Sequence, residues 1–240
     1  NTFLQALMVN SLGGPQVTGS KGDVIIDALT VGTLPSSITT TNLVAIFGDN
    51  VTINSTINHK LNSAGGVQLD VDFTLGATKN VTINKSIGAG QDVLITGNGN
   101  IVTAKGANIL SDTDKNGVGG IFIVNNSNTG GSTTQIDGNL DTSTASVDDI
   151  QLIHNGVSTA KVVVAGNVTT HQGGDILVWS DGGIDLSGVF MGSDDVSITA
   201  LGQSAVIRGP ITADVDGPGN GFIAYAAPFA QTKLYPTAVL

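Results

Sequence analysis

Short runs of alternating apolar and polar residues recur along most of this chain. Two of them are near copies, since Asn50–Ile57 reads NVTINSTI and Asn80–Ile87 reads NVTINKSI. Weaker versions, each an Asp followed by branched apolar residues, begin at Asp92, Asp149, Asp175 and Asp195. Because strand side chains point alternately to the two faces of a sheet, each run predicts a short β-strand with its Val and Ile side chains facing inward.

A local sequence that returns along the chain is typical of a stacked repeat. From Ile176 onward, further strands start near Ile184, Val196 and Val206, at a step of roughly ten residues, so two steps make a coil of about 20 residues. In a parallel β-helix, equivalent residues of successive coils lie on one another, which selects like residues at like positions. A β-sandwich also has many short strands, but it gives no reason for one local sequence to repeat.

The fold class predicted from this pattern is therefore all-β, a single-stranded parallel β-helix of about a dozen coils of roughly 20 residues. A β-sandwich is the alternative. Stacked Ile side chains would form a continuous core, and stacked Asn or Thr side chains can form hydrogen-bonded ladders.

The composition supports strands joined by tight turns. The chain has 240 residues, of which 33 are Gly, and all 19 acidic residues are Asp. Asp and Gly disfavour helix interiors and favour turns, whereas Val, Ile and Thr favour strands. Charged residues make up only 12% of the chain, compared with about 25% in ordinary globular domains.

Three regions are predicted from the pattern. Residues 1–20 lack the repeat and are expected to form an N-terminal cap, either a short helix or an irregular segment. Residues 21–217 are expected to form the β-solenoid, with loop insertions around 111–145 on either side of one core strand at Ile121–Val124. Residues 218–240 are expected to form a C-terminal cap or a tail that crosses to another subunit.

The charge excludes several kinds of partner. The formal net charge is −10, and Arg208 is the sole arginine. No basic patch is available for phosphates, so neither nucleic acid nor an anionic membrane is an expected partner. The longest apolar run, Phe3–Val9, is too short for membrane insertion. The absence of cysteine, together with abundant Asn, Thr and Gly, suits a secreted or cell-surface protein.

Residues 171–188 read HQGGDILVWSDGGIDLSG and resemble a recurring motif of the filamentous haemagglutinin-like family, the large exoproteins of two-partner secretion. The matching residues are Gly173, Gly174, Val178, Trp179, Ser180, Asp181, Gly182 and Gly188. The weaker resemblance of the other repeats extends over roughly residues 40–215. It implies a right-handed β-helix in a secreted surface fibre, often an adhesin, and it transfers no catalytic residue.

One segment has the spacing of a calcium-binding loop. Asp112, Asp114 and Asn116 offer oxygens at alternate positions, Gly117 suits the sharp turn, and the Val118 carbonyl would be the next ligand. The twelfth position of such a loop is usually a bidentate Glu, but here it is Ile123. The segment is therefore predicted to be a possible calcium site at Asp112, Asp114, Asn116 and Val118, with an ordinary polar turn as the alternative.

No catalytic constellation stands out. The three histidines, His59, His154 and His171, are isolated and do not form a zinc signature. The expected function is a secreted, non-enzymatic module of an extracellular surface fibre or adhesin that contacts a receptor or glycan on a host or neighbouring cell. The alternative is a self-assembling subunit, a homopolymer that builds an extracellular filament, sheath or surface layer.

Overall fold

The computed structural model describes residues 44–53, 57–58, 73–215, 221–227 and 232–234, and the backbone of three strands nearer the N-terminus, β1 (Thr2–Phe3), β2 (Gln16–Thr18) and β3 (Asp23–Ile26). Every regular element in this part of the chain is a β-strand, and every strand pair is parallel. The strands form three sheets, which we name A, B and C. The all-β prediction is confirmed, and the β-sandwich alternative is wrong, because a sandwich is built from antiparallel strands.

From β4 to β24, each coil contributes one strand to each sheet. Sheet B contains β2, β4 (Val44–Gly48), β7 (Phe73–Ala77), β10 (Val93–Gly97), β13 (Ile121–Asn125), β16 (Ile150–His154), β19 (Ile176–Ser180), β22 (Val196–Ala200) and β25 (Ile223–Ala226). Sheet A contains β1, β3, β5 (Asn50–Ile53), β8 (Val81–Ile83), β11 (Ile101–Thr103), β14 (Thr133–Ile136), β17 (Lys161–Val164), β20 (Gly183–Leu186), β23 (Ala205–Ile207) and β26 (Thr232–Leu234). Sheet C contains β6 (Ile57–Asn58), β9 (Ile87–Gly88), β12 (Ile109–Leu110), β15 (Leu140–Asp141), β18 (Val168–Thr169), β21 (Phe190–Met191) and β24 (Ile211–Thr212).

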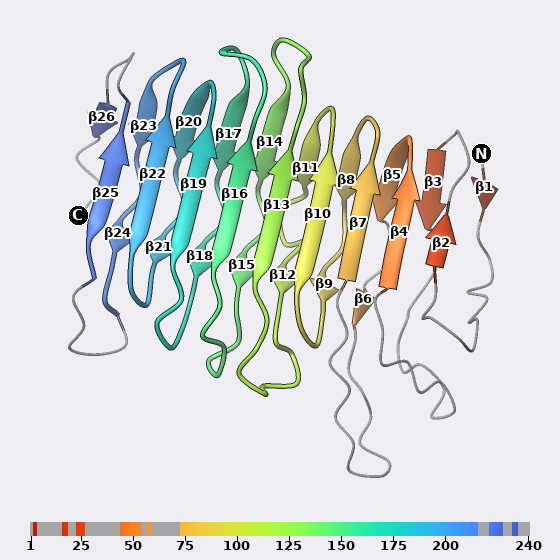
Figure 1. Ribbon diagram of the computed structural model, residues 1–240, viewed down its shortest axis with the longest axis horizontal. Coiled ribbons are helices and arrows are strands. Elements are labelled where there is room, and N and C mark those ends of the chain that lie inside the picture. Colours follow the sequence, from red (N-terminus) through yellow and green to blue (C-terminus); the bar gives the residue numbers. More distant parts are fainter. Residues whose placement is uncertain are drawn as a thin grey trace.

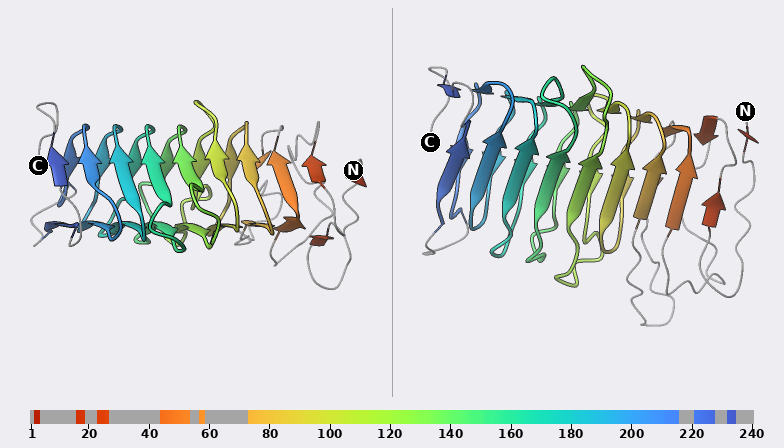
Figure 2. Two further views of the ribbon diagram at one scale, coloured as in Figure 1. Left: turned by 90° about the horizontal axis from the view of Figure 1, so that it is seen from above. Right: turned by 45° about the horizontal axis from the view of Figure 1, so that its top comes forward.

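The path of the chain is a right-handed coil. In Figure 1 it ascends through sheet B at the front, crosses at the top and descends through sheet A behind, while it advances from right to left. Figure 2 shows the same strands lying side by side as successive coils along one axis. The molecule is thus a stack of coils in which each coil pairs with the one before it and the one after it.

The two near-copy segments lie directly on each other. Val51 pairs with Val81 and Ile53 with Ile83 in sheet A, and Ile57 pairs with Ile87 in sheet C. The side chains of Ile53 and Ile83 are both completely buried. The repeat in the sequence is therefore a repeat in space, as the pattern predicts.

The core is a set of apolar columns that run along the stack. The column at the centre of sheet B consists of Leu75, Ile95, Ile123, Leu152, Val178 and Ile198, all completely buried. Full burial of one such side chain stabilises the fold by about 1.5–3 kcal/mol. Because the columns are continuous, the core ties the described coils into a single unit.

The coils are less uniform than the sequence predicts. Equivalent residues are 20 positions apart in some coils, as between Asp175 and Asp195, and 29 apart in others, as between Asn126 and Asn155. Among the described residues, sheet A has ten strands and sheet B has nine, so the described stack has fewer coils than the predicted dozen. The extra residues lie in the turns, because the strands of each sheet keep nearly constant lengths.

Some segments outside the predicted solenoid continue the sheets. Strands β1 and β2 lie within residues 1–20, and β25 and β26 lie within residues 218–240. Apart from residues 221, 222 and 227, which flank β25, the rest of these two predicted caps is outside the described residues. Residues 111–145 contain β13, β14 and β15, which continue all three sheets, so the longer loops here are confined to the turns between them.

Hydrogen-bonded ladders of side-chain oxygens, mostly from Asn and Asp, run along the stack at or just before the start of many strands. Before sheet A, Oδ1 of Asn50 accepts from the side chain of Asn80, and Oδ1 of Asn80 accepts from the backbone of Asn100. Before sheet C, the acceptors are the side-chain oxygens of Ser86, Asn108, Asn139 and Asn167. Each accepts from the backbone amide of the equivalent residue one coil further on, and the last of these donors is Val189. Before sheet B, the acceptors are Asp92, Asp149, Asp175 and Asp195.

Candidate functional site

The outer surface of sheet B differs from the rest of the molecule because it carries no charge. Its outward positions on β7 to β22 are Thr74, Gly76, Leu94, Thr96, Phe122, Val124, Gln151, Ile153, Leu177, Trp179, Ser197 and Thr199. None of these side chains is ionisable, in a chain whose net charge is −10. On sheet A, in contrast, the outward positions include Lys161 and Asp185, which form an ion pair.

Six of the outward residues of sheet B form a contiguous apolar surface, which we call the sheet-B stripe. Its members are Leu94, Phe122, Val124, Ile153, Leu177 and Trp179. They come from four successive coils, β10, β13, β16 and β19, and each is partly exposed. At about 4.8 Å between neighbouring strands, the stripe extends roughly 14 Å along the axis.

Trp179 ends the stripe at its boundary with a polar region. It stacks between Ile153 on one coil and Thr199 on the next. Its indole Nε1 donates a hydrogen bond to Oδ1 of Asp181 at 3.2 Å, which fixes the direction of the ring. The tryptophan of the haemagglutinin-like motif thus lies on the outer face of sheet B, where it contacts neighbouring coils and remains partly open to solvent.

An acidic rim borders the stripe on the side where the strands of sheet B begin. It is the aspartate ladder described above, and its members Asp149, Asp175 and Asp195 follow one another on consecutive coils. Desolvation raises the pKa of the Asp175 carboxyl, the amide of Asp195 opposes this by donating to it, and the like charges of Asp149, Asp195 and Asp194 raise the pKa further. The rim therefore gathers negative charge along one edge of an uncharged face.

The stripe is indicated in the sequence by continuous apolar runs, and not by the alternating pattern that predicts the strands. An outward position of a solvent-facing strand is ordinarily polar, but Ile121–Val124 and Ile176–Trp179 are apolar at every position. Such runs indicate a strand that is covered on both faces. Here the inner face packs in the core, and the outer face is the stripe.

The predicted calcium segment forms a tight turn between sheets C and B. Asp112 is completely buried and has a φ of 47°, in the left-handed region that Asp tolerates better than most residues. Its Oδ1 accepts hydrogen bonds from the amides of Asn116 at 2.8 Å and Gly117 at 3.3 Å. Its Oδ2 is also buried and has no hydrogen-bond partner.

The remaining residues of the predicted calcium segment lie at the open side of this turn. The carboxylate of Asp114 accepts from the backbone and side-chain nitrogens of Asn116, at 3.4 and 3.3 Å, and Oδ1 of Asn116 accepts from the amide of Val118 at 3.0 Å. Ile123 is fully buried in the core and offers no ligand. Within the described ranges, no three His or Asp side chains converge on a common point, so the turn supplies two carboxylates and neutral oxygens.

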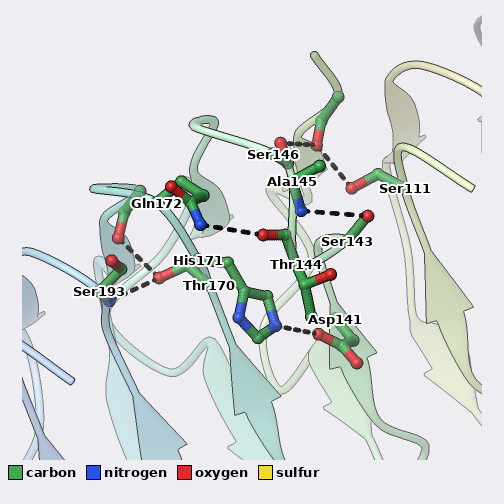
Figure 3. A network of polar contacts seen from close by, with 12 residues as sticks. Ser111, Asp141, Ser143, Thr144, Ala145, Ser146, Thr170, His171, Gln172 and Ser193 are labelled. Atoms are coloured by element: carbon green, nitrogen blue, oxygen red, sulfur yellow. Dashed lines mark hydrogen bonds and ion pairs between the residues drawn. The ribbon is translucent and has the colours of Figure 1, made fainter. Parts of the chain in front are cut away.

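Neighbouring turns hold this segment in place. The carbonyl oxygen of Gly119 accepts from Oγ of Ser111 at 2.7 Å and from Oγ of Ser146, one coil further on, at 3.0 Å. Both serines are labelled in Figure 3. The amide of Gly119 donates to Oδ2 of Asp148 at 2.6 Å. The amide of Val147 donates to the carbonyl of Gly117 at 3.4 Å. The turn after β12 is therefore fastened to the turn after β15.

The same row of turns continues with a paired histidine. Nε2 of His171 lies 3.1 Å from Oδ1 of Asp141 on the preceding coil, and the side chain of Gln172 donates to the carbonyl of Thr144 (Figure 3). Desolvation raises the pKa of the Asp141 carboxyl, and the hydrogen bond and charge of His171 oppose the increase.

His154 has a different environment from His171, because it faces the interior at the end of β16. Its ring nitrogens lie 3.1 Å from the hydroxyls of Ser132 and Thr134. Desolvation lowers the pKa of His154, while its hydrogen bond to the carbonyl of Lys161 and the charge of Asp181 oppose the decrease. His59 lies outside the described residues. The structure thus does not bring His154 and His171 together, as expected from their separation in sequence.

A shallow polar groove lies at the opposite edge of sheet B, beside the longer turn between β13 and β14. It is lined by Lys79, Asn80, Asn98, Asn100, Thr129 and Ser132, with intervening glycines. Two of these residues, Asn80 and Asn100, belong to the ladder before sheet A. The groove offers amides and hydroxyls for hydrogen bonding and a single cation.

Comparisons with known proteins do not extend this description: no family model, no curated protein and no solved structure matches the chain. The resemblance to the filamentous haemagglutinin-like family therefore stays a prediction. None of the described residues belongs to a helix that is long and apolar enough to cross a membrane.

Proposed function

We propose that this protein is a non-enzymatic β-solenoid module of a secreted surface fibre or adhesin, and that it contacts its partner through the sheet-B stripe. The observation that carries the proposal is the uncharged outer face of sheet B, with six apolar side chains aligned on four coils. The cores of protein interfaces are depleted in charge and rich in aromatic residues. A contiguous apolar surface offers a partner area that can be removed from water on binding.

The chemistry of the stripe favours a protein receptor over a glycan. Four of its six members, including Val124 and Ile153, are aliphatic, and such side chains pack against apolar protein surfaces. The acidic rim formed by Asp149, Asp175 and Asp195 would complement basic side chains on the partner. A second copy of this chain is a poorer match, because its net charge is also −10. The expected partner is thus a receptor whose apolar patch is flanked by Lys or Arg.

The small size of the stripe implies that a single contact is weak. The stripe is roughly 14 Å long and two residues wide. Its area is therefore well below the 800 Å² or so that each partner buries in a stable complex. Repetition of the module along a fibre would convert weak contacts into firm attachment, because linked sites bind at a high effective concentration. The low affinity of one module is therefore compatible with an adhesive role.

The test uses beads coated with the protein and applied to cultured epithelial cells. Ile153→Lys introduces a charge in the middle of the stripe, and Val163→Lys introduces the same charge at an outward, half-buried position of sheet A in the same coil. We expect Ile153→Lys to reduce bead attachment at least tenfold and Val163→Lys to leave it unchanged. Protease treatment of the cells should abolish attachment of the wild-type beads.

Other outcomes discriminate between the proposals. Loss of attachment after periodate oxidation of the cells, with protease treatment having no effect, would indicate a glycan receptor. Clumping of wild-type beads in the absence of cells would favour the self-assembling filament, sheath or surface-layer subunit. Equal attachment by the two lysine variants would refute a role for the stripe.

A further inference from the structure

The geometry of the turn at residues 112–118 points to a binding site for calcium, with Oδ2 of Asp112 as its innermost ligand. This oxygen is buried and lacks a hydrogen-bond partner, on a side chain that is completely buried. A buried carboxylate oxygen without a partner is strongly destabilising, because it has lost its hydration and gained nothing in return. A bound cation removes this penalty. The inference does not depend on the adhesive role proposed above.

The turn holds the Asp112 carboxylate in an orientation suited to a ligand. Its Oδ1 accepts from the amides of Asn116 and Gly117, and Oδ2 is the oxygen of this carboxylate that remains for a metal. Gly117 has a φ of 96°, which bends the chain back toward Asp112. The carboxylate is thereby fixed by the backbone before any cation arrives.

A second unpartnered atom lies on the same edge of the stack. Among the buried side-chain atoms of the described residues, only Oδ2 of Asp112 and Oγ1 of Thr142 lack a partner. Thr142 directly follows Asp141, which pairs with Leu110, so it occupies on the next coil the position that Ser111 occupies on this one. Both unsatisfied atoms thus fall in adjacent turns, whereas elsewhere the polar atoms of the described interior are paired.

The available ligands suit calcium better than other metals. Besides Oδ2 of Asp112, the turn offers the carboxylate of Asp114, Oδ1 of Asn116 and the carbonyl of Val118, all of them oxygens. Calcium accepts six to eight oxygen ligands in a flexible arrangement, with water completing the shell, whereas magnesium demands a strict octahedron. With only two carboxylates, we expect a dissociation constant of about 0.1–1 mM, the range of extracellular calcium modules.

Calcium bound here would also stiffen the next coil. Gly117 and Gly119 hydrogen-bond to Val147, Ser146 and Asp148 in the following turn. Fixing one turn therefore restrains its neighbour, and the effect should be visible as slower amide hydrogen exchange across both segments.

The experiment is calorimetric titration of the whole protein with CaCl₂, compared with two matched variants. Asp112→Asn preserves an Oδ1 that can accept from Asn116 and Gly117, and Asn tolerates positive φ, so the turn should survive while the ligand oxygen is lost. Asp214→Asn makes the same change at another Asp with positive φ, at 58°. We expect one binding event in the wild-type protein and in Asp214→Asn, and at least a tenfold weaker one in Asp112→Asn.

Thermal unfolding supplies a second measurement. At ten times the dissociation constant, calcium should shift the ratio of folded to unfolded protein about elevenfold in the wild type, which raises Tm by about 3–5 °C. MgCl₂ at equal ionic strength should raise Tm less, and in Asp112→Asn the rise with calcium should be less than about 2 °C. Absence of binding heat at 10 mM CaCl₂, about 10 to 100 times the expected dissociation constant, would overturn the inference. Equal binding by Asp112→Asn, or equal stabilisation by the two salts, would do the same.

Discussion

The backbone amide of Asp195 donates a hydrogen bond to Oδ1 of Asp175 at 2.9 Å, one coil apart, and the amide of Asp175 makes the same bond to Asp149. Each carboxylate therefore satisfies the amide that follows it in the stack. The arrangement also places like charges on consecutive coils, at the spacing of neighbouring strands. In the ladders before sheets A and C, Asn performs the same task without the repulsion.

Asp175→Asn is expected to stabilise the protein at neutral pH. The folded-state pKa of Asp175 is raised above its usual value of 3.8, so the native state favours the protonated form. The ionised carboxylate of Asp175 therefore lowers the stability of the folded state above the folded-state pKa. This loss disappears as the pH falls below 3.8. Asn can still accept the bond from Asp195. We expect a gain of less than about 1 kcal/mol at pH 7, vanishing near pH 3, measured by urea unfolding.

Asp185→Asn is the control for this substitution, because Asp185 has positively charged neighbours. Its carboxylate accepts from Nε and a terminal nitrogen of Arg208 at 3.1 and 3.2 Å, and Nζ of Lys161 lies 3.6 Å away. The same change should cost up to about 1 kcal/mol at pH 7. Destabilisation of similar size in both variants would show that the repulsion along the aspartate ladder is negligible.

Asn139→Ala should remove one rung of the ladder before sheet C. Its Oδ1 accepts from the amide of Asn167 at 2.9 Å, and the expected cost is about 0.5–1.5 kcal/mol in the free energy of unfolding. Asn139→Ser should cost less, because Ser86 fills an equivalent position and accepts from Asn108 at 3.1 Å. Chemical unfolding of both variants checks the order, and a Ser variant no better than the Ala variant would contradict it.

Gly166→Ala should damage the corner between sheets A and C. A Cβ at Gly166 would lie 1.9 Å from the carbonyl oxygen of Gly138 on the preceding coil, and Gly188 and Gly209 continue this column of close contacts. Because the obstacle is backbone, we expect a loss of at least about 2 kcal/mol, or roughly 4–8 °C in Tm.

Gly130→Ala is the matched control for the corner. Its Cβ would meet only the hydroxyl oxygen of Thr159, at 3.3 Å, which belongs to a side chain and not to the backbone. We expect a change within about 0.5 kcal/mol in thermal or chemical unfolding. Equal tolerance of alanine at Gly166 would mean that the coils can separate locally at little cost.

His154→Asn should remove a loss of stability at acidic pH. The folded-state pKa of His154 lies below its usual value of 6.5, so the native state binds the proton less tightly than the unfolded chain. Stability is then intact above pH 6.5 and falls as the pH drops below it, by up to 1.4 kcal/mol or so per pH unit. Asn is the replacement because Asn125 occupies the paired position one coil earlier.

The measurement for His154 is the pH dependence of unfolding between pH 7 and pH 5, rather than stability at one pH, because the smaller side chain also leaves space in the interior. The wild-type protein should lose stability over this range, and the variant should lose less. A His154 variant with an unchanged slope would contradict the assignment.

The stacking of the coils was predictable from sequence because it repeats residue by residue. Ile53 and Ile83 occur in near-identical segments and pair in the same register, both fully buried. The strands of sheet C, such as Ile87–Gly88 and Ile109–Leu110, have two residues each, too few to show an alternating pattern. That is why the sequence indicates two strands per coil where the structure has three.

Coil length and the sheet-B stripe were harder to predict, for separate reasons. Turn length is not coded in the strand pattern, so residues 111–120 and 126–132 enlarge their coils without altering the sheets. The stripe requires knowing which face of β13 is inside, and Ile121–Val124 is apolar on both. The calcium segment, in contrast, is a local motif, and its turn forms within the motif itself, from Asp112 to Gly117.

The variable turns have a consequence for how this molecule could change over time. Neighbouring strands keep one spacing whether a coil contains 20 residues or 29, so the physical length of the rod is set by the number of coils and not by the number of residues. New segments can therefore be inserted at the corners while the pitch and the straightness of the rod are preserved. The stacked strands and the turns between them can then evolve independently.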